Sequence, residues 1–507
     1  MLDKTRHRKL KLVIDVLLSV TPISSSTGES LDIRKLAEVI PLLKKGDCME
    51  PSSYRPVSQL PVISKALERA VYLQMIRYLE LNNLIHPNHH GGRKSHSTAT
   101  ALLQMYDQWV EEVKQGKVVG LLMGDLSAAY DMVPFMILEE KLKIFKFDDK
   151  SLEWINSFLN GRSQSTTIDG KLSSPLSMKQ GLPQGSILLP VLYILYTCDI
   201  PDLAHDHPVS ITNPIINCEE CGSMTAYIDD CSYSVGCDST AELSGKLSEK
   251  YSKLASYMAS NQLILNDDKT HVMVFGKKSM TANRSDVVIK AGSESITPTT
   301  NETLLGGHLD QDLKWKDHIL SNKKSLVKQL TTRLNGLSLV SKRASFKTRI
   351  MVANAVINSK LCFLIALWGS TQDYLLRALQ VIQNKAARQA TGLCWFTPTA
   401  TLLRKCKWLS VKQLSVYHTI LTTHKIVTTS KPKYLFNKMC TQHEQNTRQA
   451  VKFDDKFTGK TERAQSSFCY RGAVLYNKLP LDIRGTTSNS QFKKKLKEWV
   501  AINITID

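Results

Sequence analysis

Two carboxylate sites in the chain have the residue types that phosphoryl-transfer chemistry requires. Asp125 follows a continuous apolar run, residues 118–123, which predicts a strand buried on both faces. Asp229 and Asp230 lie between two short apolar runs, which places them at the tip of a predicted hairpin. Either site alone could be ordinary cap or turn chemistry. Held on adjacent strands, the two sites could bind two divalent cations about 3.5–4 Å apart.

A third segment, residues 180–186, lies between the two carboxylate sites. Its sequence is Gln-Gly-Leu-Pro-Gln-Gly-Ser, and the apolar run 187–195 that follows predicts the start of a helix. Glycine and proline bring the backbone close to a ligand, and a structural turn explains the glycines but not the two glutamines and the serine. Mg²⁺ takes a few carboxylates and the phosphates of its substrate, so such a centre needs neither cysteine nor histidine.

Together, these segments resemble the three central polymerase motifs of reverse transcriptases. Further segments resemble the fingers, the last two palm motifs and the C-terminal half of non-LTR retrotransposon enzymes (LINE-type, jockey-like). In chain order the matching segments are Tyr54–Ser58 with Ser64-Lys65, Arg93 with Ser97-Thr98, Asp125–Asp131, Gly181–Ser186, Tyr227–Asp230, Asn266 with Lys269-Thr270, Leu304–Gly307 with Trp315 and His318-Ile319, Trp368-Gly369, Gln383–Arg388 and Tyr476–Pro480. The order of so many motifs makes the resemblance specific from about residue 36 to the C-terminus.

The resemblance implies an α+β fold, namely a right-hand polymerase with a ferredoxin-like palm, α-rich fingers and a helical thumb. The implied parts are an N-terminal helical extension over 1–35, fingers and palm over 36–310, a helical thumb over 311–430 and a basic C-terminal region over 431–507. Hydrophobic periodicity agrees with this picture. It predicts strands over 39–43, 118–123, 224–228, 232–235 and 272–275, helices over 63–82, 98–113 and 241–260, and mainly amphipathic helices beyond residue 320.

The resemblance also assigns site residues. The implied catalytic set is Asp125, Asp229, Asp230 and Lys269. The three carboxylates of this set would be the ligands of two Mg²⁺ ions, with Mn²⁺ as an alternative. The implied nucleotide-binding set is Arg55, Lys65, Tyr130, Gln184 and Gly185.

Each implied role has a physical reason. Tyr130 would stack under the deoxyribose and sterically reject a 2′-hydroxyl, while Gln184 would contact the template–nucleotide pair. Lys65 and Arg55 would neutralise the triphosphate, because ammonium and guanidinium groups bind phosphate oxygens strongly. Lys269 would donate a proton to the leaving pyrophosphate, although an ordinary solvated lysine is the alternative reading.

Several features depart from the family pattern. Leu189 stands where the family usually has a glycine, and Ala128 where a lysine is usual. Residues 89–93 read His-His-Gly-Gly-Arg where aromatic residues are expected. None of these changes removes a metal ligand, but a leucine next to the nucleotide-facing loop could slow the enzyme. The residues before position 36 are also too few for the endonuclease domain of such elements, which suggests a truncated chain or a fragment.

The charge is divided unevenly along the 507 residues. Residues 321–507 carry 32 basic and 8 acidic side chains, an excess of +24, whereas residues 1–320 have a net charge of −4. A block this basic repels itself unless a polyanion is nearby, although scattered lysines can also simply keep a surface solvated. We therefore expect it to bind the template–primer duplex through its phosphates.

The cysteines point to a reducing compartment. Eleven cysteines without regular spacing indicate an intracellular protein, and no apolar run approaches the roughly 18 residues of a membrane span. Asp15 interrupts an N-terminal run that otherwise mimics a secretory signal. We expect a protein of the nucleus and cytoplasm. One open question is zinc binding by His205, His207, Cys218 and Cys221, whose Cys-x-x-Cys spacing is zinc-like but can arise by chance.

The sequence therefore predicts an RNA-directed DNA polymerase that uses dNTPs, an RNA template and a DNA primer. The alternative is a catalytically decayed relic that binds RNA through its basic region without synthesis. The complete set of three carboxylates favours the enzyme, because decay has no reason to spare them. A viral or telomeric polymerase with the same palm is a third reading, and the jockey-like C-terminal half argues against it.

Overall fold

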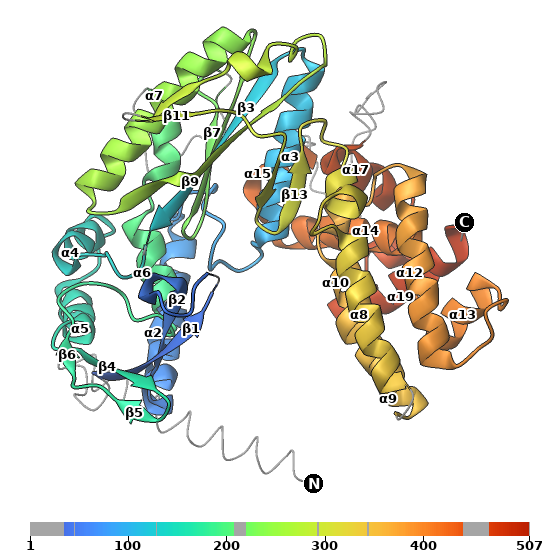
Figure 1. The fold of residues 1–507 in the computed structure, drawn as a ribbon, viewed down its shortest axis with the longest axis horizontal. Helices are drawn as coiled ribbons and strands as arrows, with labels where there is room; N and C mark the ends of the chain where they lie inside the picture. The colour runs from blue at the N-terminus through green and yellow to red at the C-terminus, as the bar shows by residue number, and fades with distance from the viewer. Residues whose placement is uncertain are drawn as a thin grey trace. The chain divides into compact units, whose positions relative to one another are not determined.

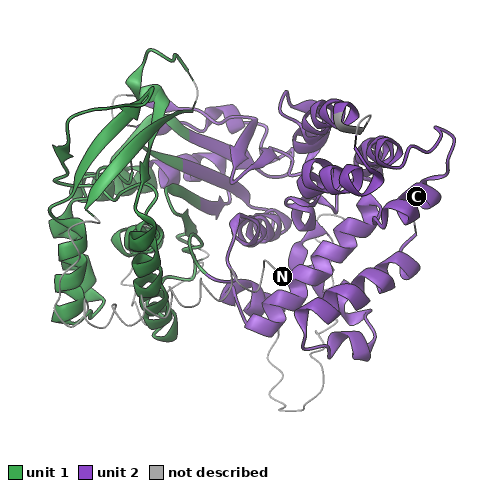
Figure 2. Cartoon of the chain, turned by 90° about the horizontal axis from the view of Figure 1, so that it is seen from below, with its two compact units in different colours: residues 1–93, 124–233, 249–270 green, residues 94–123, 234–248, 271–507 purple. Residues whose placement is uncertain are grey.

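The computed structural model of the chain describes residues 35–44, 46–127, 129–206, 218, 220–291, 294–341, 344–439 and 466–505. The chain forms two compact units, each assembled from three separate segments (Figure 2). Unit 1 comprises residues 1–93, 124–233 and 249–270, and unit 2 comprises residues 94–123, 234–248 and 271–507. The predicted N-terminal extension lies almost entirely outside the described residues.

A four-stranded sheet carries the carboxylate motifs. Its strand order is β7 (Ser223–Tyr227), β8 (Asp230–Cys237), β3 (Val118–Ser127) and β9 (Ile264–Phe275). A long segment with several helices and three strands of a second sheet connects β3 to β7, β7 turns directly into β8, and α7 (Thr240–Ser260) connects β8 to β9 (Figure 1). This is the β-α-β-β-α-β connection of the ferredoxin-like fold. The predicted fold class, α+β with a ferredoxin-like palm, is confirmed.

Strand β3 is longer than its apolar run. Residues 118–124 and 126 are buried, as expected for a strand covered on both faces, whereas Asp125 is partly open to solvent. The sequence predicted a strand that runs into Asp125 and ends there. Strand pairing in fact continues to Ser127, so Asp125 lies on regular strand backbone.

A second sheet in unit 1 lies in the predicted fingers. Strand β1 (Leu36–Leu43) pairs antiparallel with β2 (Tyr54–Gln59) and parallel with β4 (Ser163–Ile168), and β4 pairs with β5 (Lys171–Leu172) and β6 (Leu176–Ser177). The helices of this unit are α2 (Val62–Leu81), α4 (Phe135–Ile144), α5 (Asp149–Leu159) and α6 (Leu189–Tyr196), with 3₁₀ turns η2 (Pro51–Ser53) and η3 (Ile200–Ala204). Helix α2 matches the prediction over 63–82 within one residue.

Unit 2 is mostly helical, as predicted beyond residue 320. Its helices are α3 (Thr98–Lys114), α8 (Leu326–Ser341), α9 (Phe346–Ala353), α10 (Ser359–Cys362), α11 (Ile365–Trp368), α12 (Asp373–Thr391), α13 (Thr399–Cys406), α14 (Val411–Thr429), α15 (Lys433–Met439), α17 (Phe468–Asn477), α18 (Leu481–Arg484) and α19 (Asn489–Asn503). The smaller elements are the hairpins β10–β11 (Ile289–Ala291, Glu294–Ile296) and β12–β13 (Asn301–Leu304, Gly307–Asp310), the 3₁₀ turn η4 (Arg284–Asp286) and the π-helical turns η5 (Asp317–Ser321) and η6 (Asn354–Asn358).

Unit 2 contains a long-range cap that joins its first helix to its last third. The buried Asp107 of α3 accepts hydrogen bonds from the backbone N–H groups of Phe468 and Cys469, both at 2.7 Å, at the N-terminus of α17. A carboxylate is favourable at this end of a helix, because the exposed N–H groups and the helix dipole are positive there. Helix α17 in turn packs on α14. Residues 468–477 are therefore part of the core of unit 2.

Among the described residues, no helix combines the length and the apolar character that crossing a lipid bilayer demands.

Candidate active site

The β7–β8 hairpin presents two of the predicted carboxylates. Ile228 and Asp229 form the turn, and β8 begins at Asp230. Ile228 has a φ of +60°, a left-handed conformation that is strained for a β-branched residue. The predicted hairpin tip is confirmed, and the strained turn fixes the direction in which Asp229 leaves the sheet.

The segment before α3 supports this turn. The backbone N–H of His90 donates to the carbonyl of Ala226 in β7 at 2.9 Å, and His89 bridges the same residue in parallel fashion. A Cβ on Gly91 would lie 2.3 Å from Cγ1 of Ile228, so any larger residue would push the turn away. The histidines and glycine that depart from the family pattern therefore hold the hairpin that carries Asp229.

The three carboxylates influence one another electrostatically. Burial and the charge of Asp125 raise the pKa of Asp229, while Arg55 and Lys44 oppose this rise. Although solvent reaches Asp230, the surrounding protein and the charges of Asp229 and Asp125 raise its pKa to about 6. Burial and these like charges make Asp229 and Asp230 harder to ionise, and cations beside them would relieve that cost.

Two basic side chains partly balance this negative charge. Lys269, exposed on β9, places its Nζ 3.5 Å from Oδ2 of Asp125. Arg55 on β2 is exposed, and its positive charge opposes the rise in the pKa of both Asp229 and Tyr130 that burial causes. Nearby, Nδ2 of Asn266 donates to Oγ of Ser127 at 3.1 Å and ties β9 to the end of β3. Lys269 and Arg55, two of the predicted basic site residues, thus act on the cluster of three carboxylates.

Tyr130 lies beside the carboxylates. Its ring meets the ring of Tyr193 edge to face, with centroids 4.9 Å apart. Burial raises the pKa of its hydroxyl, and the charges of Asp229 and Asp230 raise it further. Tyr130 therefore carries a neutral, half-buried ring whose orientation is fixed by Tyr193.

The glycine-rich loop is fastened to its surroundings through the backbone. Leu182 N–H donates to the carbonyl of Tyr130 at 2.7 Å, and Ser58 N–H in β2 donates to the carbonyl of Gln184 at 2.7 Å. Gly185 has a φ of +129°, and a Cβ there would lie 2.4 Å from the Ser58 carbonyl oxygen. The loop therefore joins the turn after β3 to strand β2, and glycine is required at 185.

Side chains complete the fastening. The buried Glu68 of α2 accepts hydrogen bonds from Oγ of Ser186 at 2.6 Å and from the N–H of Ile187 at 2.7 Å. On the other side, Nε2 of Gln184 donates to both carboxylate oxygens of Asp131, at 3.2 and 3.1 Å. Asp131 therefore orients the side chain of the half-buried Gln184.

Lys65 is connected to this site more indirectly. It is half-buried on the first turn of α2, one turn before Glu68. The other nucleotide-binding residues of the predicted set, Arg55, Tyr130, Gln184 and Gly185, are joined to the carboxylates or to one another by the contacts above. The link from Lys65 to the loop runs through α2.

Sequence reasoning missed three contributors. Glu68 holds the loop, Asp131 orients Gln184, and the charge of Lys44 opposes the rise in pKa that burial causes at Asp229 and Asp131. Asp131 was within a recognised motif and Lys44 within a basic turn, but neither spacing indicated a partner. A glutamate on an otherwise apolar helix face was the available signal for Glu68.

Of the two single residues that differ from the family pattern, the structure describes Leu189 but not Ala128. Leu189 is 8% exposed in α6, so its side chain lies inside the protein. Ala128 lies outside the described residues, and so does His207 of the zinc-like group.

Motif residues in unit 2 have structural roles. Ser97 caps α3 in a reciprocal capping box with Thr100. Trp315, His318 and Trp368 are buried and form successive aromatic contacts, with centroids 5.9 and 6.1 Å apart. These residues pack the core of unit 2.

Comparison with known proteins identifies the family to which the chain belongs. The family model described as "Reverse transcriptase (RNA-dependent DNA polymerase)" matches residues 42–316, more than half of the chain. The chain belongs to the reverse transcriptase family. The matched range includes all nine predicted site residues of this reverse transcriptase chain.

Curated relatives come from insect mobile elements. The chain is 26% identical over 384 residues to the "Probable RNA-directed DNA polymerase from transposon X-element" of Drosophila melanogaster, covering 74% of this chain and 40% of the relative. It is 25% identical over 405 residues to the "RNA-directed DNA polymerase from mobile element jockey" of Drosophila funebris, covering 78% and 42%. The predicted resemblance to jockey-like enzymes is confirmed. The chain spans about two fifths of the length of these relatives.

Solved structures show weaker likeness. Apo telomerase from Candida tropicalis is 13% identical with a TM-score of 0.42, covering 93% of this chain and 68% of that one. Telomerase from Candida tropicalis in complex with a fragment of telomeric RNA is 12% identical with a TM-score of 0.40, covering 97% and 68%. Scores this low do not bear on the function of this reverse transcriptase chain.

Proposed function

We propose that this chain is the polymerase part of a jockey-like mobile element and copies RNA into DNA by two-metal nucleotidyl transfer. The observation that carries the proposal is that Asp125 on β3 lies close enough to the neighbouring β7–β8 hairpin for its charge to raise the pKa of both Asp229 and Asp230. A decayed RNA-binding relic would have no need to keep three carboxylates at such an electrostatic cost.

The donor set fits Mg²⁺. Carboxylate oxygens are hard ligands, and three of them at one edge of a sheet leave room for substrate phosphates and water. Burial, and then the charges of neighbouring carboxylates, raise the pKa values of Asp229 and Asp230, and bound cations would offset both effects. Asp125 and Asp229 would hold two Mg²⁺ ions with Asp230 beside them, and Mn²⁺ has the same ligand preference. When bound, the ions would activate the primer 3′-hydroxyl and neutralise charge that develops at phosphorus.

At phosphorus the reaction forms one bond and breaks one. The primer 3′-hydroxyl loses its proton to water, its oxygen bonds to the α-phosphorus of the dNTP, the bond from that phosphorus to its bridging oxygen breaks, and pyrophosphate leaves. Lys269, which now pairs with Asp125, is close enough to the site to deliver a proton to the pyrophosphate. Arg55 and Lys65 would bind the triphosphate, and Lys44 would add to their positive charge.

Selection of the nucleotide rests on the held loop and the fixed tyrosine. Tyr130, oriented by Tyr193, would lie under the sugar and exclude a 2′-hydroxyl. Gln184 and Gly185 would contact the template–nucleotide pair, with the loop kept in place by Glu68 and Ser58. A held loop supports selection because a shift of about 1 Å can cost a hundredfold in rate.

The larger organisation follows the same proposal. Fingers and palm would extend over 36–310, a thumb over 311–430 and a basic C-terminal region over 431–507, with the basic half binding the RNA template and DNA primer. An enzyme that copies RNA into DNA works beside its nucleic acids, so we propose the nucleus and cytoplasm as its locations.

Primer extension tests this function. The purified full chain, an RNA template, an annealed DNA primer, dNTPs and Mg²⁺ should give template-dependent extension that stops when Mg²⁺ is chelated. Asp125→Asn should abolish extension, because amide oxygen is a weaker and uncharged ligand. Asp238→Asn is the matched control, since Asp238 is an exposed carboxylate directly after β8. A folded, RNA-binding wild-type chain without any extension would favour the relic instead.

A further inference from the structure

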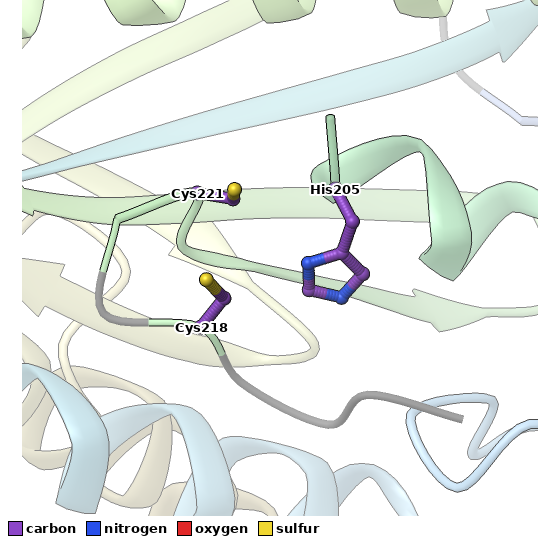
Figure 3. A group of neighbouring side chains, drawn as sticks. All are labelled: His205, Cys218 and Cys221. Carbon is purple, nitrogen blue, oxygen red and sulfur yellow. The ribbon is translucent and has the colours of Figure 1, made fainter. Parts of the chain in front are cut away.

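A second cluster of metal-ligating residues lies in unit 1, at the start of β7. The ligand atoms of His205, Cys218 and Cys221 all lie within 4.8 Å of one another. In Figure 3 the imidazole ring of His205 faces the two cysteines, and the three side chains surround a common space. His205 ends the turn η3, whereas the cysteines precede β7, so two separate segments supply the group.

The two cysteines belong to a tight turn. Cys218 N–H donates to the carbonyl of Gly222 at 3.1 Å, and Gly222 N–H donates to the carbonyl of Cys218 at 2.9 Å. Gly222 has a φ of +79°, which a glycine adopts without strain. Cys-x-x-Cys on such a turn directs two sulfur atoms to the same side, which is the arrangement of structural zinc sites.

Contacts around the turn fix its place. The backbone N–H of Asp206 hydrogen-bonds the sulfur of Cys221, and the hydroxyl of Tyr233 in β8 donates to the carbonyl of Cys221 at 2.7 Å. The carboxylate of Asp206 pairs with Lys250 at 2.5 Å and also with Lys253. The segments on both sides of the group are thereby anchored to β8 and α7.

From these observations we infer that His205, Cys218 and Cys221 bind one Zn²⁺ ion. Tetrahedral zinc with Zn–S near 2.3 Å and Zn–N near 2.0 Å needs ligand atoms about 3.5–3.8 Å apart, so separations of up to 4.8 Å in the present group must shorten by at most about 1.3 Å. Two thiolates neutralise the ion, which suits residues as buried as His205 and Cys221, at 8% and 7% exposure. Three protein ligands leave the fourth position to water, so this site would be open where most structural zinc sites are closed by a fourth side chain.

The ion would have a structural role separate from the proposed polymerase reaction. It would tie the end of η3 to the start of β7, the strand that leads into the turn carrying Asp229. Thiolate and imidazole ligands select zinc, whereas the carboxylates at the other end of β7 select Mg²⁺. The two ions would therefore not compete for one site.

Metal analysis of the full chain, purified under reducing conditions with added zinc, tests the inference. We expect about one zinc per chain after removal of excess metal, and Co²⁺ in its place should give thiolate-to-cobalt charge-transfer absorption. Cys218→Ser, Cys221→Ser and His205→Ala should each weaken zinc binding at least tenfold. Cys48→Ser is the matched control, because Cys48 is an exposed cysteine outside the group.

Two results would overturn the inference. One is a folded wild-type chain that holds no more zinc than Cys218→Ser. The other is a disulfide between Cys218 and Cys221 in freshly purified protein. If the variants do not fold, alkylation of the wild-type chain decides instead. Zinc should then protect Cys218 and Cys221 but not Cys48, and equal labelling with and without zinc would contradict the site.

Discussion

The two ends of strand β7 carry opposite kinds of ligand. Before its first residue, His205, Cys218 and Cys221 form a group of soft nitrogen and sulfur ligands, of which His205 and Cys221 are buried. After its last residue, Asp229 and Asp230 present hard oxygen ligands that are at least partly open to solvent. The backbone also differs, because the cysteine turn uses a glycine at positive φ whereas the aspartate turn forces Ile228 into it.

This contrast indicates a division of labour. An unstrained, partly buried turn with neutralising thiolates suits an ion that stays bound and stabilises the fold. A strained, accessible turn with mutually repelling carboxylates suits ions that arrive with a substrate and complete the site. One short strand would thus link a permanent metal to a catalytic one.

The largest expected effect is the loss of primer extension when a carboxylate after β7 is replaced, which a change at the cysteines before β7 should not cause. Asp229→Asn should lower primer extension about a thousandfold or more, because losing a metal ligand removes several kcal/mol of charge stabilisation and about 4 kcal/mol corresponds to that factor. Its zinc content should be unchanged. Cys218→Ser should do the reverse, losing zinc while keeping most of its activity per folded molecule. Loss of both properties in either variant would mean that the two ends of β7 are not independent.

The supporting loop gives the next largest effect. Gly185→Ala should destabilise the chain by about 1–3 kcal/mol, because it combines a strained φ with a Cβ 2.4 Å from the Ser58 carbonyl oxygen. Extension should fall with it, and zinc content should not. Gly245→Ala is the matched control: Gly245 lies in α7 with open space around it, so alanine should stabilise by about 0.5–1 kcal/mol. Urea unfolding measures the stability of both variants. Equal stability of the two would contradict the requirement for glycine at 185.

The choice between dNTPs and rNTPs tests the role of Tyr130, which lies beside the carboxylates. Tyr130→Ala should reduce the preference for dNTPs over rNTPs by at least about tenfold, because the ring that excludes a 2′-hydroxyl is gone. Tyr130→Phe keeps the ring and should keep the preference. Competition between matched dNTPs and rNTPs in primer extension gives the ratio. The steric role is wrong if the alanine and phenylalanine variants select alike.

The smallest expected effect is on the salt dependence of nucleic-acid binding, which should depend neither on the zinc ligands before β7 nor on the carboxylates after it. Truncation at residue 320 is unsuitable here, because it would leave the carboxylate of Asp107 without the N–H groups of Phe468 and Cys469. Replacing Lys493 and Lys494, both exposed on α19, with glutamine should instead reduce the salt slope of RNA–DNA hybrid binding. Each lost phosphate contact should change it by about 0.7–0.9.

The exposed pair Lys277 and Lys278, which follow β9, provides the matched control for this experiment. Glutamine at both positions should leave the slope as in the wild type. If both double variants change the slope equally, the basic C-terminal half has no special part in holding the duplex.

Several parts of the fold and the site could be read from the sequence, because their signals are local. The apolar run before Asp125, the strand–turn–strand pattern around Asp229 and the periodicity of α2 and α3 depend on neighbours along the chain. Strand β9 shows the limit. Its second half, near residues 272–275, was predicted from its apolar residues, but its first half is polar and largely exposed and had no such pattern.

What the tertiary structure alone decided is which distant residues meet. The sequence determined the candidate carboxylates, the glycine-rich loop and the spacing of Cys218 and Cys221. It did not determine that Glu68 would hold the loop or that Asp107 would cap a helix more than 300 residues away. Such contacts depend on strand order and helix packing, so no local pattern specifies them. Burial makes these contacts important for stability. A buried carboxylate that loses its hydrogen-bond donors lowers the stability of the fold far more than an exposed carboxylate does.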